Sequence, residues 1–359
     1  MSHTIVFTGG GTAGHVTPNI ELIRIFQQDG WSIHYIGSEQ GVEKDMMTRL
    51  SIPYHAVSTG KLRRYFSLQN CFDPFKIVYG FWQAYHLLRQ LKPEVVFSKG
   101  GFVAFPVVVG AWLHGIPVVA HESDMTPGLA NRLSFPFLNK ICVTFAVAKQ
   151  AFKRQDKVVV TGTPIRQALF HGQKQSGLAL CGFTEDIPCI LVVGGSQGAQ
   201  ALNACVRSSL EHLCASFQII HLCGKGKVEP LLLGKPRYYQ FEYVDQELPD
   251  LFAAAEMVIS RAGANSLYEI LALKKPHVLV PLSAQVSRGD QVHNARYFQK
   301  QGISTVIDES ELTSDTLCAA VNQVMSDRDA IIKKISILSI QSATEAIVAV
   351  IKEQVHEKS

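Results

Sequence analysis

The chain has 359 residues, of which 47% are hydrophobic and 18% are charged. Because a single hydrophobic core stops growing at roughly 250–300 residues, this length predicts two domains. The composition excludes a disordered chain. A formal net charge of +4 is small for this size and gives no reason to expect a nucleic-acid partner.

Cysteine usage and apolar segments indicate a cytosolic protein. The eight cysteines form no C-x-x-C pair, which favours reduced thiols. Met1–Phe7 contains no basic segment followed by an apolar one, so we expect no signal peptide. The most apolar stretch, Phe102–Ala120, is interrupted by Gly115 and Pro117, whereas a membrane span needs about 20 unbroken apolar residues. We therefore expect no membrane span.

Short apolar runs alternate with amphipathic segments in the first half of the chain. This pattern is typical of a parallel sheet covered by helices on both faces. The predicted helices are Pro18–Gln28 and Phe105–Leu113. The predicted strands are Thr4–Thr8, Ser32–Ile36, Glu94–Phe97, Pro117–Ala120, Ile141–Thr144 and Lys157–Val160.

The same pattern restarts in the second half, which predicts a second Rossmann-like domain. A helix over Ala199–Leu213 follows the first of six strands, predicted at Cys189–Val193, Gln218–Leu222, Tyr239–Tyr243, Met257–Ser260, His277–Val280 and Ser304–Val306. We place the linker near Thr161–Pro164, giving domains 1–162 and 163–340. A terminal helix within 341–359 can belong to either domain and is expected to be able to pack back on the first.

Two glycine-rich turns join a strand to a helix. Gly9–Gly14 satisfies G-x-G-x-x-G, and Glu39 follows the second strand, where a ribose-binding acid would lie in a dinucleotide site. Gly194–Gly198 repeats the arrangement. Glycines allow close backbone approach, and a helix start offers unpaired N–H groups to an anion. A dinucleotide cofactor remains open for the first turn, and a plain tight turn without a ligand remains open for the second. In two domains, such turns would face each other across a cleft.

A third candidate segment, Ser260–Glu269, follows a predicted strand and opens a helix. Backbone N–H groups near Ala264 and Asn265 are placed to take a phosphate, and the Glu269 carboxylate can accept both hydroxyls of a ribose. The alternative is a structural role in capping the helix.

Eight motifs in order make the chain resemble the MurG family of peptidoglycan N-acetylglucosaminyltransferases, over nearly its whole length. They are Gly9–Pro18 (GGGTAGHVTP), Lys99–Phe102, His121–Asn131 (HESDMTPGLAN), Gly162–Arg166 (GTPIR), Gly194–Asn203 (GGSQGAQALN), Tyr243–Asp245, Arg261–Glu269 and Gly289–Ala295 (GDQVHNA). The resemblance implies an α/β chain with the GT-B fold, in which two Rossmann-like domains with parallel sheets face each other across a cleft.

The resemblance also implies a reaction and its partners. The reaction is transfer of N-acetylglucosamine from UDP-N-acetylglucosamine to lipid I, giving lipid II with inversion at the anomeric carbon. No cofactor is expected. The implied location is the cytoplasmic face of the bacterial membrane, with roles in cell-wall synthesis, cell shape and division. Other cell-wall and division proteins are possible partners.

The resemblance to the family also implies roles for individual residues of this chain. The resemblance implies that Arg166 and Ser196 hold the diphosphate, and that the backbone at Val244 reads the uracil edge. The remaining implied contacts are Ala264 and Asn265 to the nucleotide, Glu269 to the ribose, Gln291 with Asp290 to the sugar, and Thr12, Ala13, Gly14 and His15 at the reacting centre. The chain departs from the common family pattern at Asp124 and Asp290, which leaves the sugar contacts of these two residues open.

His15 is our candidate for the general base, since its unperturbed pKa of about 6.5 suits proton abstraction near neutral pH. Glu122 and Asp124 are rival bases, and a His15 that only caps or packs at the helix start is the structural alternative. We interpret Asp327–Asp329, the one Asp-x-Asp, as a solvated surface and expect no metal dependence.

A basic and aromatic stretch is a candidate membrane contact. Cations beside exposed apolar side chains suit an anionic bilayer surface. The residues concerned are Lys61, Arg63, Arg64, Phe75, Phe81 and Trp82. An ordinary helix packed on the first domain is the alternative.

Other functions fit less of the chain. Another GT-B transferase acting on a lipid acceptor would share the second domain but not the first. An epimerase shares only the architecture, and a nicotinamide enzyme leaves Ser196, Glu269 and Gln291 without roles. The joint presence of His15, Arg166 and Glu269 argues against an inactive nucleotide-sugar-binding scaffold.

Overall fold

The computed structural model describes residues 3–59, 73–195, 199–284 and 287–356. The chain divides into two compact units. Unit 1 comprises Met1–Ile165 and Ser342–Ser359, and unit 2 comprises Arg166–Gln341. Lys61, Arg63, Arg64 and Ser196, which the sequence singles out, lie outside the described residues.

Unit 1 contains a parallel sheet with the strand order β3-β2-β1-β4-β5-β6-β7 among the described residues. Every register places a strand beside its neighbour in the same direction, so all carboxyl ends lie at one edge. The strands are β1 (Thr4–Thr8), β2 (Ser32–Ser38), β3 (Tyr54–Val57), β4 (Val95–Ser98), β5 (Val118–Glu122), β6 (Lys140–Val143) and β7 (Val158–Val160).

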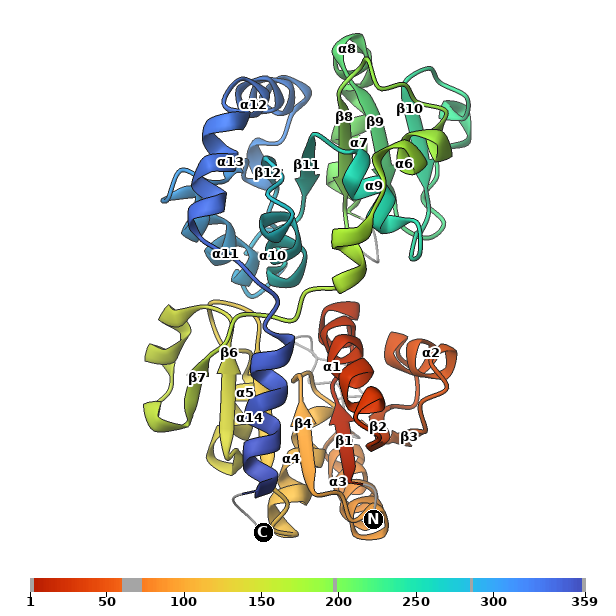
Figure 1. Cartoon of the computed structure of the whole chain (residues 1–359). Helices are drawn as coiled ribbons and strands as arrows, with labels where there is room; N and C mark the ends of the chain where they lie inside the picture. The colour runs from red at the N-terminus through yellow and green to blue at the C-terminus, as the bar shows by residue number, and fades with distance from the viewer. Residues whose placement is uncertain (1–2, 60–72, 196–198, 285–286, 357–359) are drawn as a thin grey trace. The chain divides into compact units, whose positions relative to one another are not determined.

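Helices of unit 1 cover its sheet (Figure 1). They are α1 (Thr17–Gln28), α2 (Val42–Arg49), α3 (Asp73–Leu91), α4 (Ala104–Leu113), α5 (Leu129–Ser134) and α14 (Thr344–His356), with short 3-10 helices η1 (Ala13–His15), η3 (Phe135–Phe137), η4 (Ala146–Ala151) and η5 (Gln155–Lys157). The terminal helix α14 belongs to this unit and packs beside α1 and β4. Ile347 and Ile351 of α14 are fully buried in the same core as Phe7 and Phe97 of the central strands.

Unit 2 repeats the architecture with the strand order β10-β9-β8-β11-β12-β13, again parallel. Its strands are β8 (Cys189–Val193), β9 (Gln218–Leu222), β10 (Tyr238–Phe241), β11 (Met257–Ser260), β12 (His277–Leu279) and β13 (Thr305–Val306). Its helices are α6 (Lys174–Cys181), α7 (Gln200–Ser208), α8 (Leu210–Ser216), α9 (Leu248–Ala254), α10 (Ala264–Ala272), α11 (Asp290–Gln299), α12 (Ser314–Ser326) and α13 (Arg328–Ile337), with η6 (Gln167–His171), η7 (Pro230–Leu232) and η8 (Glu309–Glu311).

The prediction of one helix over Ala199–Leu213 is wrong, because α7 ends at Ser208 and α8 begins at Leu210. The intervening Ser209 donates its hydroxyl to the carbonyl of Cys205, 2.8 Å away and four residues earlier. Such back-bonding bends helices. No prediction was made for strand β3, nor for helices α2, α5, α6, α9, α12 and α13.

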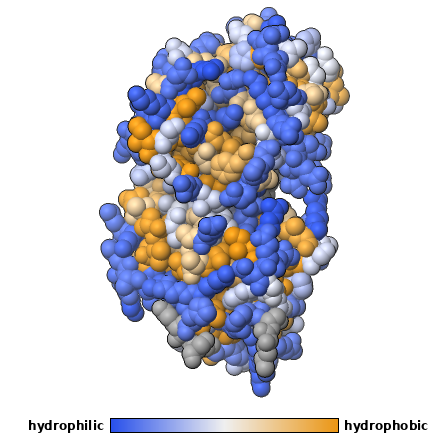
Figure 2. Space-filling view, viewed as in Figure 1, coloured by the Kyte–Doolittle hydropathy of each residue, from blue (hydrophilic) through white to orange (hydrophobic). Residues whose placement is uncertain are grey.

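Apolar side chains reach the surface of both units between hydrophilic ones (Figure 2). No helix in the described parts of the chain is long and apolar enough to cross a membrane. The seven cysteines within these parts are free thiols. Burial raises the pKa of the Cys142 and Cys189 thiols to about 12, which makes both poor nucleophiles.

Candidate active site

The strand order of unit 1 reverses between β1 and β4, which is where open α/β sheets bind ligands. The first glycine turn leaves β1 at this point, and Lys99–Phe102 leaves β4 beside it. The two segments are in direct contact. A Cβ on Gly101 would lie 2.4 Å from the carbonyl oxygen of Gly10, and one on Gly11 would lie 2.8 Å from the Phe102 ring. Only glycine permits this approach, since Gly11 and Gly101 also have positive φ.

A buried carboxylate that the sequence did not reveal supports the first turn. Glu43 of α2 accepts from the backbone N–H of Gly11 at 3.3 Å, and from the N–H and hydroxyl of Ser38 at 3.2 and 2.5 Å. Glu39, the acid expected from the dinucleotide pattern, is exposed, whereas Glu43 is fully buried. A negative charge built into the turn opposes a second anion there, so the geometry disfavours a dinucleotide pyrophosphate at Gly9–Gly14.

His15 lies in η1, directly after the first turn, and is partly exposed. Its Nδ1 is 3.1 Å from the carbonyl oxygen of Lys99. Because a carbonyl only accepts, Nδ1 carries the hydrogen and Nε2 carries the lone pair in the neutral ring. This is the tautomer that a general base requires. Thr12 and Gly14 are exposed beside it, and the backbone of Ala13 belongs to η1.

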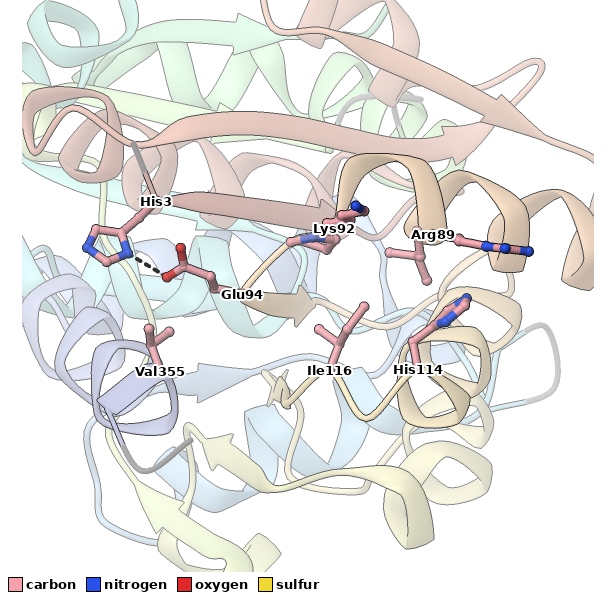
Figure 3. Close-up of a pocket in the computed structure, with 9 residues that line it drawn as sticks. His3, Arg89, Lys92, Glu94, His114, Ile116 and Val355 are labelled. Atoms are coloured by element: carbon pink, nitrogen blue, oxygen red, sulfur yellow. Dashed lines mark hydrogen bonds and ion pairs between the residues drawn. The ribbon is translucent and has the colours of Figure 1, made fainter. Parts of the chain in front are cut away.

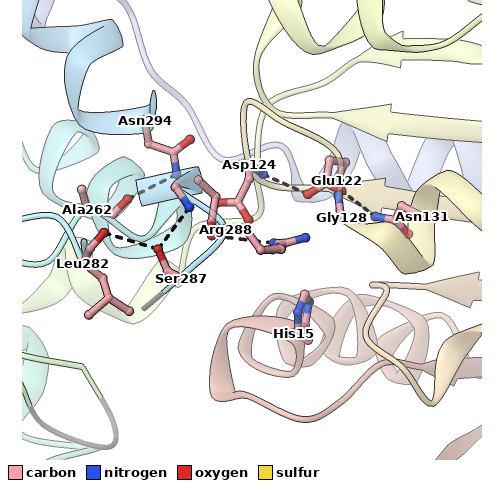
Figure 4. A network of polar contacts seen from close by, with 12 residues as sticks. His15, Glu122, Asp124, Gly128, Asn131, Ala262, Leu282, Ser287, Arg288 and Asn294 are labelled. Atoms are coloured by element: carbon pink, nitrogen blue, oxygen red, sulfur yellow. Dashed lines mark hydrogen bonds and ion pairs between the residues drawn. The ribbon is translucent and has the colours of Figure 1, made fainter. Parts of the chain in front are cut away.

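Glu122, at the end of β5, holds the following loop together (Figure 4). One carboxylate oxygen accepts from the N–H of Asp124 at 3.1 Å. The other accepts from the N–H of Gly128 at 2.8 Å and from the amide of Asn131 at 2.9 Å. Glu122 is 5% exposed, whereas Asp124 is partly exposed. The arrangement favours a structural role for Glu122, which holds the backbone of Asp124 while the Asp124 residue stays partly exposed.

Two buried bases lie behind this loop. Lys99 is 2% exposed, and its ammonium contacts the hydroxyl of Ser123. Burial lowers the pKa of Lys99 to about 8, against the opposing effect of Glu122 and Asp124. His121 is fully buried and donates from Nε2 to the carbonyl of Gly162 at 2.8 Å. Burial, and then the charge of Lys99, lower the pKa of His121 well below its usual value, so it stays neutral.

In unit 2 the strand order reverses between β8 and β11. The second glycine turn leaves β8 and α10 begins just after β11, so the two predicted nucleotide segments meet the same switch point. Gly194 is required there, because a Cβ would lie 2.9 Å from the backbone nitrogen of Ala199. Ala264 is buried and Asn265 is partly buried in the first turn of α10.

Arg166 and Glu269 form a bidentate ion pair within unit 2. The Arg166 Nε and terminal nitrogen donate to the two Glu269 oxygens at 2.7 and 2.8 Å. The side chains are 27% and 8% exposed, respectively. A paired fork of this kind fixes both groups in position. The residues predicted to hold diphosphate and ribose are therefore in contact, Arg166 just before η6 and Glu269 on α10.

The segments after β10 and β12 carry the remaining candidates. Val244 is buried. The Gln291 side-chain oxygen accepts from the N–H of Leu282 at 3.0 Å. Asp290 is the first residue of α11, and its carboxylate oxygen lies 3.7 Å from a guanidinium nitrogen of Arg288. Asn294, fully buried on α11, donates to the carbonyl of Ala262 at 3.2 Å (Figure 4). These bonds tie α11 to the loops that follow β11 and β12.

A cavity of about 600 Å³ lies elsewhere in unit 1 (Figure 3). His3, Glu94 and Ile116, which line it, precede β1, β4 and β5. It therefore lies at the amino-terminal edge of the sheet, whereas the switch-point residues lie at the carboxyl edge. We do not assign it to the candidate site.

The predicted membrane residues are only partly described. Trp82 on α3 is 52% exposed and Phe81 is partly buried. Phe75 belongs to α3, but its side chain lies outside the described residues, as do Lys61, Arg63 and Arg64. The structure adds exposed Val78 and Tyr79 on α3 and exposed Trp112 and Leu113 on α4.

Comparison with known proteins identifies the class. The glycosyltransferase family 28 N-terminal domain matches residues 5–143, and its C-terminal domain matches residues 189–350. A crystal structure of MurG from Acinetobacter baumannii has a TM-score of 0.75 and 23% identity, and the match covers 98% of this chain and 100% of that one. The fold is thus that of a GT-B glycosyltransferase, with two parallel-sheet Rossmann-like units.

Full-length relatives narrow the class further. A Legionella pneumophila (strain Paris) protein is 65% identical over 356 residues, which cover 99% of this chain and 98% of that protein. A Clostridium tetani (strain Massachusetts / E88) protein is 49% identical over 353 residues, 98% of each. Both are named UDP-N-acetylglucosamine–N-acetylmuramyl-(pentapeptide) pyrophosphoryl-undecaprenol N-acetylglucosamine transferase. The chain belongs to this family, MurG, as its motifs predict.

Proposed function

We propose that this chain transfers N-acetylglucosamine from UDP-N-acetylglucosamine to lipid I, giving lipid II, with inversion at the anomeric carbon. The observation that carries the proposal is 65% identity over 99% of the chain to a protein named for this transfer. The two switch points support it, since each provides one binding edge for one of two substrates.

Unit 2 is proposed to bind the donor. The glycine turn with Ser196, the start of α10 and Arg166 would hold the diphosphate, and Glu269 would accept the ribose hydroxyls. Because Arg166 and Glu269 pair with each other at 2.7 Å, the donor would exchange part of this ion pair for contacts with its own charge and hydroxyls. The backbone at Val244 would contact the uracil, and Gln291 with Asp290 would contact the sugar.

Unit 1 is proposed to bind the acceptor and supply the base. The lone pair of His15 Nε2 would take the proton of the acceptor hydroxyl while its oxygen forms the new bond to the anomeric carbon. The bond from that carbon to the UDP oxygen breaks, and UDP leaves with the electron pair. Arg166 and helix N-termini stabilise the departing charge. Nδ1, bound to the carbonyl of Lys99, keeps the ring in the required tautomer.

A UDP-release assay on the full chain, with UDP-N-acetylglucosamine and with or without a lipid I analogue, tests the proposal. We expect release that depends on the analogue, together with a product heavier by one N-acetylhexosamine. Release driven by another lipid acceptor alone would favour a different GT-B transferase. Donor binding without release under any condition would favour a scaffold.

We further propose peripheral attachment to the cytoplasmic membrane face through α3 and the stretch before it. Exposed Tyr79 and Trp82 suit the interfacial region of a bilayer. Co-sedimentation with vesicles containing anionic lipid should fall for a Lys61/Arg63/Arg64→Glu variant and for Trp82→Ala, relative to wild type. Equal binding by all three proteins would contradict the proposal.

A further inference from the structure

Lys99 joins the two catalytic segments of unit 1 at the switch point. It directly follows β4, and its backbone carbonyl accepts from His15 Nδ1 at 3.1 Å. Its side chain runs the other way, to the hydroxyl of Ser123 in the loop after β5. A Cβ on Gly9 would lie 3.0 Å from the Lys99 Cβ, so the residue also packs on the first glycine turn.

Burial of the Lys99 ammonium costs desolvation free energy, which indicates that the charge has a function. Lys99 is 2% exposed, and its hydrogen-bond partner in the structure is a neutral hydroxyl. An apolar side chain of similar length would usually pack there at lower free-energy cost, since desolvating a charge costs several kcal/mol. The carboxylates of Glu122 and Asp124 offset part of this cost through their field. Buried charged groups of this kind are common at functional sites, where they contribute to binding or catalysis.

We propose that Lys99 is a positioning residue for the transfer, in which the carbonyl orients His15 while the ammonium holds the Ser123–Asp124 loop beside it. The proposal rests on the proposed function. The charged form is the one that holds the loop, so loss of its proton would loosen the site. The titratable groups around it are His15 of η1, His121 and Glu122 of β5, and Asp124 of the following loop.

The test compares Lys99→Met with Lys153→Met in the full chain. Methionine keeps the backbone carbonyl and the length but removes the ammonium. Lys153 is an exposed lysine of the same unit and controls for general loss of charge. Transfer to a lipid I analogue is measured from pH 6 to 9.5, with thermal unfolding recorded for each protein.

We expect Lys99→Met to lower kcat about 10–100-fold, with the KM for the donor unchanged, because small misplacements at a reacting centre are costly. In wild type, kcat should fall above about pH 8 as Lys99 loses its proton. This falling limb should be absent in Lys99→Met and unchanged in Lys153→Met. A purely structural lysine would not change the shape of the profile.

Ser123→Ala is the second variant, and it keeps the proposal testable if Lys99→Met does not fold. Removing the hydroxyl that accepts from the ammonium lowers the pKa of Lys99 further, so the falling limb should move to lower pH. Wild-type kcat and profile in both variants would overturn the proposal, as would losses that only follow the unfolded fraction. A wild-type protein that transfers no sugar at any pH would instead overturn the proposed function.

Discussion

His15 differs from three buried histidines of the chain in the environment of its ring. Its Nδ1 is bound by a backbone carbonyl while the ring stays partly exposed, whereas His121, His221 and His277 are buried. Burial lowers the pKa of all three buried rings. A base must be reachable by its substrate, and His15 satisfies this condition.

We expect His15→Ala to lower kcat about 10²–10⁴-fold, because a general base contributes about this much. Donor affinity, measured by titration with UDP-N-acetylglucosamine, should be unchanged, since the donor is assigned to unit 2. His212→Ala, at an exposed position on α8, serves as the matched control. Near-full turnover by His15→Ala would transfer the base role to Asp124 or Glu122.

His277 should make the stability of the fold depend on pH. Burial lowers its pKa to about 4, while its hydrogen bond to the carbonyl of Lys275 opposes the shift. In the unfolded chain the pKa returns to about 6.5, so between these values the unfolded chain binds more protons. The free energy of unfolding therefore falls as pH is lowered from about 6.5 to 4, by about 2 kcal/mol at pH 5.

Urea unfolding of wild type and His277→Gln between pH 7 and 5 measures this effect. Because other groups titrate in both proteins alike, the difference in slope isolates His277. The variant should lose less stability over this interval than wild type does. Parallel curves for the two proteins would contradict the assignment.

The acidic residue beside the first glycine turn is not the one that the sequence predicts. The spacing rule for dinucleotide sites points to Glu39, but the carboxylate inside the turn is Glu43. Glu39 lies in the loop before α2, whereas Glu43 lies in the first turn of α2, a helix whose polar sequence resembles that of a surface helix. Only the folded backbone, with Ser38 and Gly11 both donating to one carboxylate, distinguishes them.

At the scale of elements, the contact between the loops after β1 and β4 depends on Gly101. Gly101→Ala brings a Cβ to 2.4 Å from the Gly10 carbonyl oxygen, in addition to the cost of a φ of +85°. Gly115→Ala is the matched control, because its φ is +64° but no atom lies within 4 Å of the added carbon. The control should cost about 1–2 kcal/mol of unfolding free energy.

Gly101→Ala should cost more than this control and should also lower kcat, since the displaced loop carries Lys99 and thereby orients His15. Denaturant unfolding and the transfer assay measure the two effects. Equal stability losses with unchanged turnover in both variants would show that the loop contact does not matter.

The sequence predicts most strands because buried parallel strands are continuous apolar runs. β3 escaped prediction since its burial is incomplete, as expected for the edge of a sheet. The break between α7 and α8 was not predicted, because a serine within a helix is common. The hydrogen bond from the Ser209 hydroxyl to the Cys205 carbonyl exists only in the folded chain. The glycine turns predict two ligand-binding segments, whereas the strand order that makes them switch points comes from the fold. The Arg166–Glu269 pair was not predictable, because it joins residues 103 apart.

At the scale of the whole molecule, the terminal helix is part of the first unit. Ile351 of α14 is fully buried in the core that contains Phe7 and Phe97. Ile351→Ala should lower the stability of unit 1 by about 2–5 kcal/mol. Hydrogen exchange resolved by peptide should show lost protection in unit 1 strands and retained protection in unit 2. Equal loss in both units would mean that the units unfold together.

The chain passes from one unit to the other at Ile165–Arg166 and returns at Gln341–Ser342. Ser342 fastens the two passages, since its hydroxyl accepts from the N–H of Ile165 at 3.0 Å and donates to its carbonyl at 3.2 Å. The restart of the strand pattern predicts a linker near Thr161–Pro164, and the first passage lies at Ile165–Arg166. The side on which α14 packs was not, because its apolar face suits either sheet.

Unit 1 is built from two separate stretches of the chain, so the ribosome makes its second stretch only after unit 2. When Ile165 leaves the ribosome, all strands of the unit 1 sheet have been synthesised. Ile347 and Ile351, which complete the core of this unit, have not yet been synthesised. At roughly 5–20 residues per second, the intervening stretch takes roughly 10–35 s to translate. Unit 2 is finished in that interval, while unit 1 keeps an uncovered apolar surface. The half of the enzyme that begins first is therefore the half that matures last, and it is the half that a chaperone would need to protect.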